Sequence, residues 1–142
     1  MATFAGSRFV GGQYPNGFGI HFEQLPDGSA LATYTFDLMK QGPPILVHGG
    51  AIAAVLDEAM TAVVFWAERP AFTVNLTIDY RLPVPIGDSV LIRAFITHSE
   101  RRKIFLRALL EFEDGTIAAE ARALFLESPK LAQSVIHQAS ED

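Results

Sequence analysis

The chain has 142 residues, a net charge of −5 and no cysteine. This length fits one domain with a sizeable core. The lack of cysteine excludes disulfides, thiolate metal sites and cysteine nucleophiles, and the negative charge, with scattered Lys and Arg, argues against a nucleic-acid partner. The N-terminus lacks the pattern of a signal peptide, and the most apolar stretch, residues 51–64, is too short and too acidic at its centre for a membrane span. We expect a cytoplasmic protein without membrane contact.

The first part of the chain predicts a hairpin. Residues 1–16 are rich in glycine and turn formers and are expected to be an irregular lead-in. Residues 18–24 predict a first strand, and residues 30–39 predict a second. Between them Asp27-Gly28 is a strong turn signal, so the two strands should pair.

A long apolar helix is expected over residues 47–67, because prolines precede it, Gly49 and Gly50 open it, and no proline interrupts it. Apolar residues surround nearly its whole circumference, so it must be buried. Asp57 and Glu58 nevertheless lie in its middle. A buried carboxylate is costly unless it has a partner, a cavity with water or a functional role. This conflict directs the search for a functional site to the helix.

After the helix the apolar pattern changes to a period of two. Residues 72–80 place apolar side chains on one face and polar ones on the other, and further strands are expected over residues 89–98, 103–113 and 116–127. The last of these strands carries a row of three alanines that leaves room for a bulky element across the sheet: Ala119, Ala121 and Ala123. A helix is the natural occupant.

Residues 128–142 are expected to be a tail or a short C-terminal helix, which would cover residues 130–138. Together the elements predict an α+β fold. A single domain, residues 1–142, would consist of an antiparallel sheet of about six strands wrapped around one long central helix, because this arrangement buries the apolar surface of both.

The helix opens with His48-Gly49-Gly50, and Asp57 follows nine positions after the histidine. The strand after the helix contains Val-Asn-Leu-Thr-Ile-Asp-Tyr-Arg-Leu-Pro over residues 74–83. With the hairpin before and the strands after, these motifs resemble the hotdog-fold acyl-CoA thioesterases, specifically the branch of the phenylacetate-degradation thioesterases. The resemblance covers residues 17–127.

The resemblance implies hydrolysis of the thioester between an acyl group and coenzyme A. It also implies a homodimer or a homotetramer with the active site at the subunit interface. Asp57 matches the family's general base or nucleophile, Gly49 matches the glycine whose amide contacts the thioester carbonyl, and Thr73 stands where relatives carry a residue that holds the attacking water. We expect no cofactor and no metal, since the histidines show no metal-ligand spacing.

Physical chemistry supports these roles. Amides in the first turn of a helix are unpaired and lie at the positive end of its dipole, so Gly49 and Gly50 could contact an oxyanion; alternatively, these glycines only permit a tight turn. Asp57 lies about 10 Å along the axis from Gly50, too far for both to contact one thioester within a subunit. A two-fold partner would bring its amides opposite Asp57. The alternative is a carboxylate that interface hydrogen bonds satisfy.

Other polar residues of the helix are secondary candidates. His48 belongs with the catalytic group, but at the helix start we expect it to orient the loop rather than to act as the base. Thr61 lies one turn after Asp57 on the same face, where it could hydrogen-bond it, and is a candidate for substrate binding. Glu58 is rotated by about 100° from Asp57 and is expected to be structural.

Two further places are candidates for substrate contacts. Some relatives carry Asn or Gln shortly before the motif histidine, where this chain has Gly42, so the adjacent Gln41 becomes the candidate. Arg101 and Arg102 lie at a strand turn and could meet the phosphates of coenzyme A, or they could simply be solvated.

Gly42 also leaves a second function open. The alternative to hydrolysis is a hotdog protein that binds an acyl-CoA or an aromatic ligand without cleaving it. A hotdog hydratase or dehydratase is less favoured, because those enzymes need a differently spaced His with Asp or Glu. The chain has no Gly-x-Ser-x-Gly motif, so a serine triad is not expected.

Overall fold

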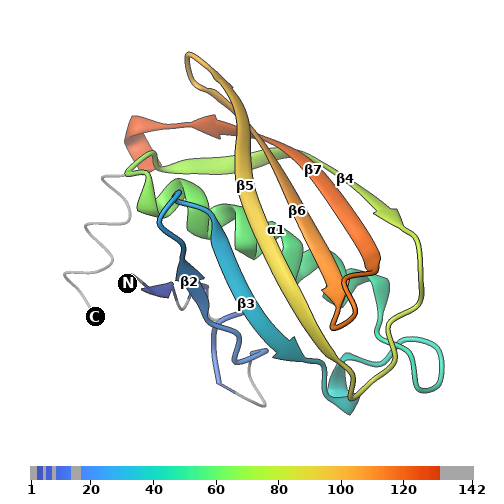
Figure 1. Cartoon of the computed structure of the whole chain (residues 1–142). Helices are drawn as coiled ribbons and strands as arrows, with labels where there is room; N and C mark the ends of the chain where they lie inside the picture. The colour runs from blue at the N-terminus through green and yellow to red at the C-terminus, as the bar shows by residue number, and fades with distance from the viewer. Residues whose placement is uncertain (1–2, 5, 8, 14–16, 132–142) are drawn as a thin grey trace.

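The computed structural model describes residues 3–4, 6–7, 9–13 and 17–131. One antiparallel sheet curves around one long helix (Figure 1), which confirms the predicted α+β hotdog architecture. The elements in chain order are β1 (Thr3–Phe4), β2 (Phe22–Gln24), β3 (Ala30–Thr35), the 3-10 helix η1 (Leu38–Lys40), α1 (Gly49–Trp66), β4 (Ala71–Tyr80), β5 (Ser89–Glu100), β6 (Lys103–Phe112) and β7 (Ile117–Glu127). Within the described residues the sheet order is β1-β2-β3-β5-β6-β7-β4.

The helix α1 begins where the sequence predicts, because His48 caps it and the glycines allow the chain to enter it. Its buried residues are almost all apolar: Ala51, Ile52, Val55, Leu56, Glu58, Ala59, Met60, Ala62, Val63 and Val64. In the described part of the chain, α1 alone has the length and the mean hydropathy, 1.4, of a membrane-spanning helix. The sheet that covers it accounts for this composition, since the core helix of a folded domain has the same character.

Small side chains on β6 and β7 let the sheet approach α1 closely. Ala108, Ala119 and Ala121 are fully buried, and Ala123 is 6% exposed. Larger neighbours fill the ends of the interface, with Phe125 at 1% exposure on β7. The alanine row therefore confirms the space that the sequence predicts for the helix, and the interior is closely packed around it.

The N-terminal half differs from the expected strand lengths. The first strand is only β2, because Gly19 has a positive φ of 72° and the extended run begins after it. The second strand ends at Thr35 rather than at residue 39, because Asp37 accepts a hydrogen bond from the Met39 amide and starts η1. The two strands still form the predicted hairpin. The lead-in is not wholly irregular, because β1 pairs with β2.

A β-bulge changes the faces of β4. Thr73 pairs with Phe125 and Asn75 pairs with Leu124, so Val74 is the extra residue. The prediction that one apolar face runs along the whole of residues 72–80 is therefore wrong. Before the bulge Thr73 points toward α1, while Phe72 and Val74 are 46% and 47% exposed. After the bulge the apolar residues turn to the helix, which lets one strand offer both a hydroxyl and a packing surface.

The C-terminal helix lies largely outside the described residues. Residues 129–131 are helical. Of the predicted helix over residues 130–138, only residues 130 and 131 are described, and both are helical.

Glu58 holds the N-terminal segment against α1. Its side chain is buried, and its two carboxylate oxygens accept hydrogen bonds from the Ser7 amide (3.0 Å) and the Ser7 hydroxyl (2.9 Å). Each of these bonds has a charged acceptor and lies in a partly buried place, so both are worth more than an exposed contact. The geometry agrees with the structural role expected for Glu58.

We expect Glu58→Ala to lower the free energy of unfolding by about 1–3 kcal/mol, because it leaves the two Ser7 donors without their acceptor. Urea denaturation would measure the change. Glu113→Ala, at the exposed β6–β7 turn, is the control and should stay within about 0.5 kcal/mol of the unmodified protein. Equal effects of the two substitutions would contradict the role of Glu58 as an anchor.

Candidate functional site

Asp57 and Thr73 form the polar centre of the site. The Thr73 hydroxyl donates a hydrogen bond of 2.7 Å to the Asp57 Oδ1 atom. Asp57 comes from the middle of α1, and the bulge of β4 turns Thr73 toward it. The carboxylate is half-buried, and its second oxygen, Oδ2, accepts from no group in the described residues. One oxygen is thus fixed in orientation, and the other can accept a proton.

Thr61 does not hold this carboxylate. Its hydroxyl donates to the backbone oxygen of Asp57 at 3.0 Å, as Ser and Thr side chains often do one turn along a helix. Thr61 therefore bonds Asp57 as the sequence allows, but through the backbone oxygen and not through the carboxylate. A role for Thr61 in substrate binding stays a prediction.

The start of α1 forms the second part of the site. His48 is the N-cap, and its Nδ1 atom accepts a 2.8 Å hydrogen bond from the Gly50 amide. The expectation of two unpaired amides is therefore wrong for Gly50, whose donor the cap uses. The Gly49 amide donates to no group in the described residues. It remains the candidate oxyanion donor, at the positive end of the helix dipole.

Glycine at position 50 has a local reason. A Cβ atom there would lie 3.0 Å from the His48 Nδ1 atom, so a side chain would push the capping ring away. This supports the expectation that His48 orients the loop. At position 49 a Cβ atom would lie 3.5 Å from the Tyr80 ring, which is an ordinary contact.

Tyr80 is a member of the site that the sequence did not single out. Its hydroxyl donates a 2.7 Å hydrogen bond to the Gly49 carbonyl oxygen. Burial raises the pKa of Tyr80, which keeps this hydroxyl protonated as a donor. The sequence contained one sign of this role: in the alternating set of residues 72, 74, 76, 78 and 80, Tyr80 alone carries a hydroxyl group. Tyr80 thereby ties β4 to the peptide group that follows the candidate oxyanion donor.

Gly42 and Gln41 lie beside the helix start. A Cβ atom at Gly42 would lie 3.0 Å from the His48 Cα atom, so the Asn or Gln that some relatives carry would not fit here without a shift of the backbone. The Gln41 Oε1 atom accepts from the Ile45 amide at 2.8 Å. Its carbonyl group therefore stabilises its own loop, and its contact with a substrate stays a prediction.

The two parts of the site are separated within one chain. Gly49 and Asp57 are eight residues apart on α1, which corresponds to about 12 Å along the axis. The structure places Thr73 with Asp57, and it places His48, Gly50 and Tyr80 with Gly49. A single chain does not bring the carboxylate and the amide to one thioester.

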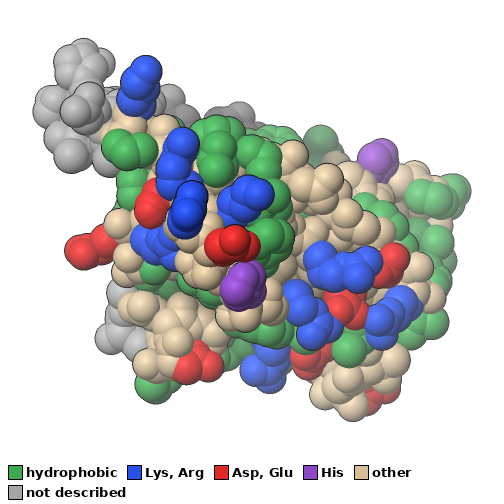
Figure 2. Space-filling view, turned by 90° about the horizontal axis from the view of Figure 1, so that it is seen from above, with side chains coloured by type: hydrophobic (Ala, Val, Ile, Leu, Met, Phe, Trp, Pro, Cys, Tyr) green, Lys and Arg blue, Asp and Glu red, His purple; other side chains and the backbone are tan. Residues whose placement is uncertain are grey.

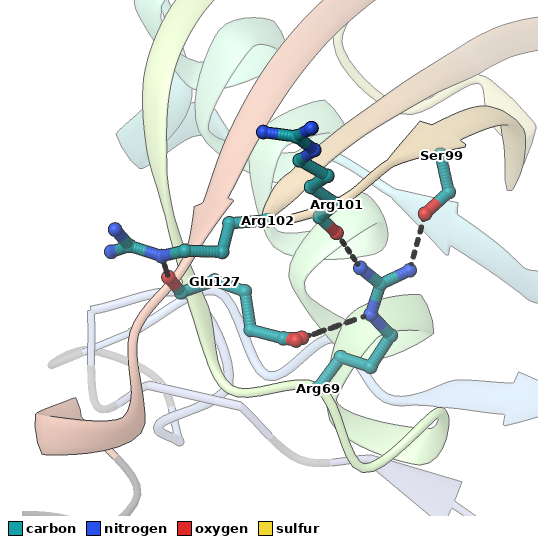
Figure 3. A network of polar contacts seen from close by, with 5 residues as sticks. All are labelled: Arg69, Ser99, Arg101, Arg102 and Glu127. Carbon is teal, nitrogen blue, oxygen red and sulfur yellow. Dashed lines mark hydrogen bonds and ion pairs between the residues drawn. The ribbon is translucent and has the colours of Figure 1, made fainter.

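Arg101 and Arg102 lie at the β5–β6 turn. Arg69, just after α1, donates to Ser99, to the Arg101 carbonyl oxygen and to Glu127, and Arg102 Nε donates to the Glu127 carbonyl oxygen (Figure 3). The turn therefore lies at the C-terminal end of α1, opposite the His48 end. The Arg101 guanidinium points away from this network (Figure 3).

The β5–β6 turn exposes Arg101, Arg102 and Lys103. In the view from above, Lys and Arg side chains form two separate groups on the surface, each with Asp or Glu side chains beside it (Figure 2). Contact of Arg101 and Arg102 with phosphates stays a prediction. Among the described residues, no three His, Asp or Glu side chains are grouped as a metal site would need.

Sequence comparison identifies the family of this site. Residues 46–119 match the sequence model described as the thioesterase superfamily, which is just over half of the chain. The chain belongs to the thioesterase superfamily. The matched segment contains His48, Gly49, Asp57, Thr73 and Tyr80, the residues that form the two parts of the site.

Curated relatives in the superfamily cover part of the chain. Acyl-coenzyme A thioesterase THEM4 of Xenopus laevis is 36% identical over 87 residues, which are 61% of this chain and 39% of that protein. THEM4 of Mus musculus is 37% identical over 90 residues, which are 63% of this chain and 39% of that protein. The chain therefore spans about two fifths of the length of these relatives.

Solved structures share the fold. A thioesterase superfamily protein superposes with a TM-score of 0.80 at 26% identity, covering 85% of this chain and 60% of the other. The Escherichia coli PaaI protein of the phenylacetic acid degradation operon gives 0.73 at 20% identity, with 78% and 84% covered. The smu.793 protein of Streptococcus mutans, solved with acetyl CoA, gives 0.71 at 19% identity, with 75% and 86% covered. The predicted resemblance to hotdog thioesterases is confirmed.

Proposed function

We propose that the protein is an acyl-CoA thioesterase. The observation that carries this proposal is the half-buried Asp57 carboxylate, held by the Thr73 hydroxyl on a helix whose buried residues are all apolar except Glu58. A helix that is apolar on nearly all sides gains no stability from such a group, so a chemical role explains it better than packing does. The name of the THEM4 relatives, acyl-coenzyme A thioesterase, supports the same activity.

The proposed reaction is hydrolysis of the thioester. The Asp57 carboxylate removes a proton from a water molecule that Thr73 helps to position, and the water oxygen attacks the carbonyl carbon. The Gly49 amide stabilises the negative charge that develops on the carbonyl oxygen. The carbon–sulfur bond then breaks, coenzyme A leaves as a thiolate that takes up a proton, and the acyl group is released as a carboxylic acid.

We further propose that two chains share this site in a homodimer. In the described sheet β4 pairs with β7 on one side only and is an edge strand. Apolar side chains are exposed on and just after it: Phe72, Val74, Tyr80 and Leu82. Pairing of two β4 edges would cover these groups. It would also bring one chain's Gly49 amide toward the partner's helix. Such an approach is needed because Gly49 and Asp57 of one chain are too far apart along α1 to contact the same thioester.

Co-expression of two inactive variants would test the shared site. Asp57→Asn removes the base, and Gly49→Val crowds the candidate oxyanion donor. If each site takes Asp57 from one chain and Gly49 from the other, a mixed dimer contains one intact site and part of the activity returns. If both residues act within one chain, the mixture stays inactive. Sedimentation of the unmodified protein would establish its oligomeric state.

The activity itself is tested with a panel of acyl-CoAs and a thiol reagent that detects free coenzyme A. We expect release of coenzyme A with at least one member of the panel. The alternative is that the protein binds an acyl-CoA without cleaving it, and Gly42 favours this alternative, because it supplies no polar side chain where some relatives carry Asn or Gln. Calorimetric binding without thiol release would support the alternative and contradict hydrolysis.

Thr73→Ala is expected to lower kcat by roughly ten-fold or more, because the carboxylate loses the hydrogen bond that orients it. Thr73→Ser keeps the hydroxyl and should retain most of the activity. Steady-state kinetics with the best acyl-CoA would measure both variants, and circular dichroism would check that both are folded. Equal losses in the two variants would show that the methyl group, not the hydroxyl, matters.

A further inference from the structure

A hollow opens beside the start of α1, and Gly50, the residue after the candidate oxyanion donor, lines it. Its volume is about 490 Å³, which is within the range of sites for small ligands. Three segments line it: the lead-in, η1 with the residue after it, and the first turn of α1. The lining residues are Phe9, Gly17, Phe18, Met39, Lys40, Gln41, His48, Gly50 and Ala51.

The inner wall of the hollow is fixed. The Phe18 ring packs against Tyr34 and Phe36, each with ring centroids 6.5 Å away. The Tyr34 hydroxyl donates a 2.7 Å hydrogen bond to the Phe18 carbonyl oxygen. Burial, and to a smaller extent Asp37, raises the pKa of Tyr34 to about 12, so this donor keeps its proton at neutral pH. A wall held in this way needs little reorganisation to receive a ligand.

The rim is apolar and exposed. Phe9 contacts the Phe18 ring at 5.7 Å between centroids and is 66% exposed, and Met39 is 69% exposed. Large apolar side chains at the mouth of a concave site are typical of a surface that binds an apolar group. Phe9 and Met39 therefore remain available to cover a ligand that enters the hollow.

Two polar side chains of the hollow, Lys40 and Gln41, already have partners. The Lys40 ammonium group forms an ion pair of 2.9 Å with Asp37, and Gln41 Oε1 accepts from the Ile45 amide. The amide-rich arm and the phosphates of coenzyme A would find few partners here, whereas an apolar chain or ring would need none. The hollow is better suited to the acyl group than to the coenzyme.

We propose that this hollow binds the acyl group of the substrate, and that Phe9 and Met39 select bulky apolar acyl groups over acetyl. The proposal rests on the acyl-CoA thioesterase activity proposed above. Gly50 lines the hollow and follows Gly49 in the chain, so an acyl group bound here would lie within one residue of the amide proposed to contact the thioester oxygen. Both residues lie outside the segment that matches the superfamily, so this selection would be a property of the N-terminal part of this chain.

The test compares acetyl-CoA, benzoyl-CoA and octanoyl-CoA as substrates. For the two bulky substrates, Phe9→Ala and Met39→Ala should each lower kcat/KM by roughly ten-fold, mainly through KM, because apolar contact is lost equally from ground and transition states. Acetyl-CoA turnover should not change. Leu38→Ala is the matched control, since Leu38 is 66% exposed on η1 and does not line the hollow. Equal losses with acetyl-CoA, or the same loss in Leu38→Ala, would overturn the proposal.

A binding experiment separates this proposal from the proposed activity. S-benzyl-CoA and S-methyl-CoA are thioethers that cannot be hydrolysed, and calorimetry measures their affinity whether or not the protein is an esterase. We expect S-benzyl-CoA to bind at least ten-fold more tightly than S-methyl-CoA, and Phe9→Ala to remove most of this difference. Equal affinities in the unmodified protein would overturn the acyl pocket. Absence of thiol release from every acyl-CoA would instead contradict the proposed activity.

Discussion

Asp57→Asn is expected to lower kcat for acyl-CoA hydrolysis by about 10²–10⁴-fold, the usual contribution of a general base. Asparagine keeps the shape of the side chain and can still accept the hydrogen bond from the Thr73 hydroxyl. It cannot remove a proton from water. The loss should therefore appear in kcat, while KM and the affinity for a thioether analogue stay close to those of the unmodified protein.

Asp79→Asn is the matched control for this substitution. Asp79 lies on β4, and its exposed carboxylate forms a 3.6 Å ion pair with the exposed Arg122. Such a surface pair contributes little, so kinetics and stability should both be unchanged. Turnover by Asp57→Asn equal to that of Asp79→Asn would exclude Asp57 as the base.

Phe125→Ala is expected to lower the free energy of unfolding by about 3–5 kcal/mol. The ring is 1% exposed and lies on β7 opposite Thr73, between the sheet and α1. Its removal leaves a cavity that the alanine row cannot fill, because small side chains already pack against the helix there. Urea denaturation followed by circular dichroism would measure the loss.

Phe105→Ala provides the comparison on the neighbouring strand. Phe105 is half-buried on β6 and faces away from α1, since its neighbours Ile104 and Leu106 are the buried positions. Its substitution should cost clearly less than that of Phe125, because the exposed side lets water replace the ring. A Phe105→Ala cost as large as that of Phe125→Ala would mean that the central layer between sheet and helix does not dominate stability.

The sequence predicts the parts of the fold that depend on local patterns. The helix begins at the glycines after His48, and the alanine row of β7 faces it, as the periodicity of each segment indicates. The structure also brings together Asp57 and Thr73, two residues that the family resemblance singled out, and their catalytic roles stay predictions. These features follow from residue type and spacing, which a single sequence contains.

The bulge in β4 was not predictable by the same means. A strict alternation over residues 72–80 assigns Thr73 and Leu76 to opposite faces, whereas the extra residue Val74 places both toward α1. Alternation alone does not show that one residue lacks a partner on the next strand. β2 and β3 are shorter than predicted for a similar reason. The positive φ of Gly19 and the hydrogen bond at Asp37 override strand propensity in the neighbouring residues.

Contacts between distant segments account for the rest of the site. Tyr80 with Gly49, Ser7 with Glu58, and the close approach of Gly42 to His48 join residues that no periodic pattern relates. The hydrogen bond that takes up the Gly50 amide is formed by a nearby residue, His48, but it depends on the rotamer of that side chain. The residues proposed to carry the chemistry were visible in the sequence, but the sequence did not show which of their hydrogen-bonding groups are available.

The order of the strands has a consequence for how the protein folds. β5, β6 and β7 form successive hairpins with short loops, whereas β4 directly follows α1 and pairs with β7, the last strand of the chain. Hairpins close quickly, and pairing across a long loop is slower because of its entropy. We expect β4 to dock late, and its register against Phe125 fixes the direction of Thr73. The geometry around Asp57 would then be among the last features to form, so a chain released before β7 is synthesised would contain the motif without its orientation.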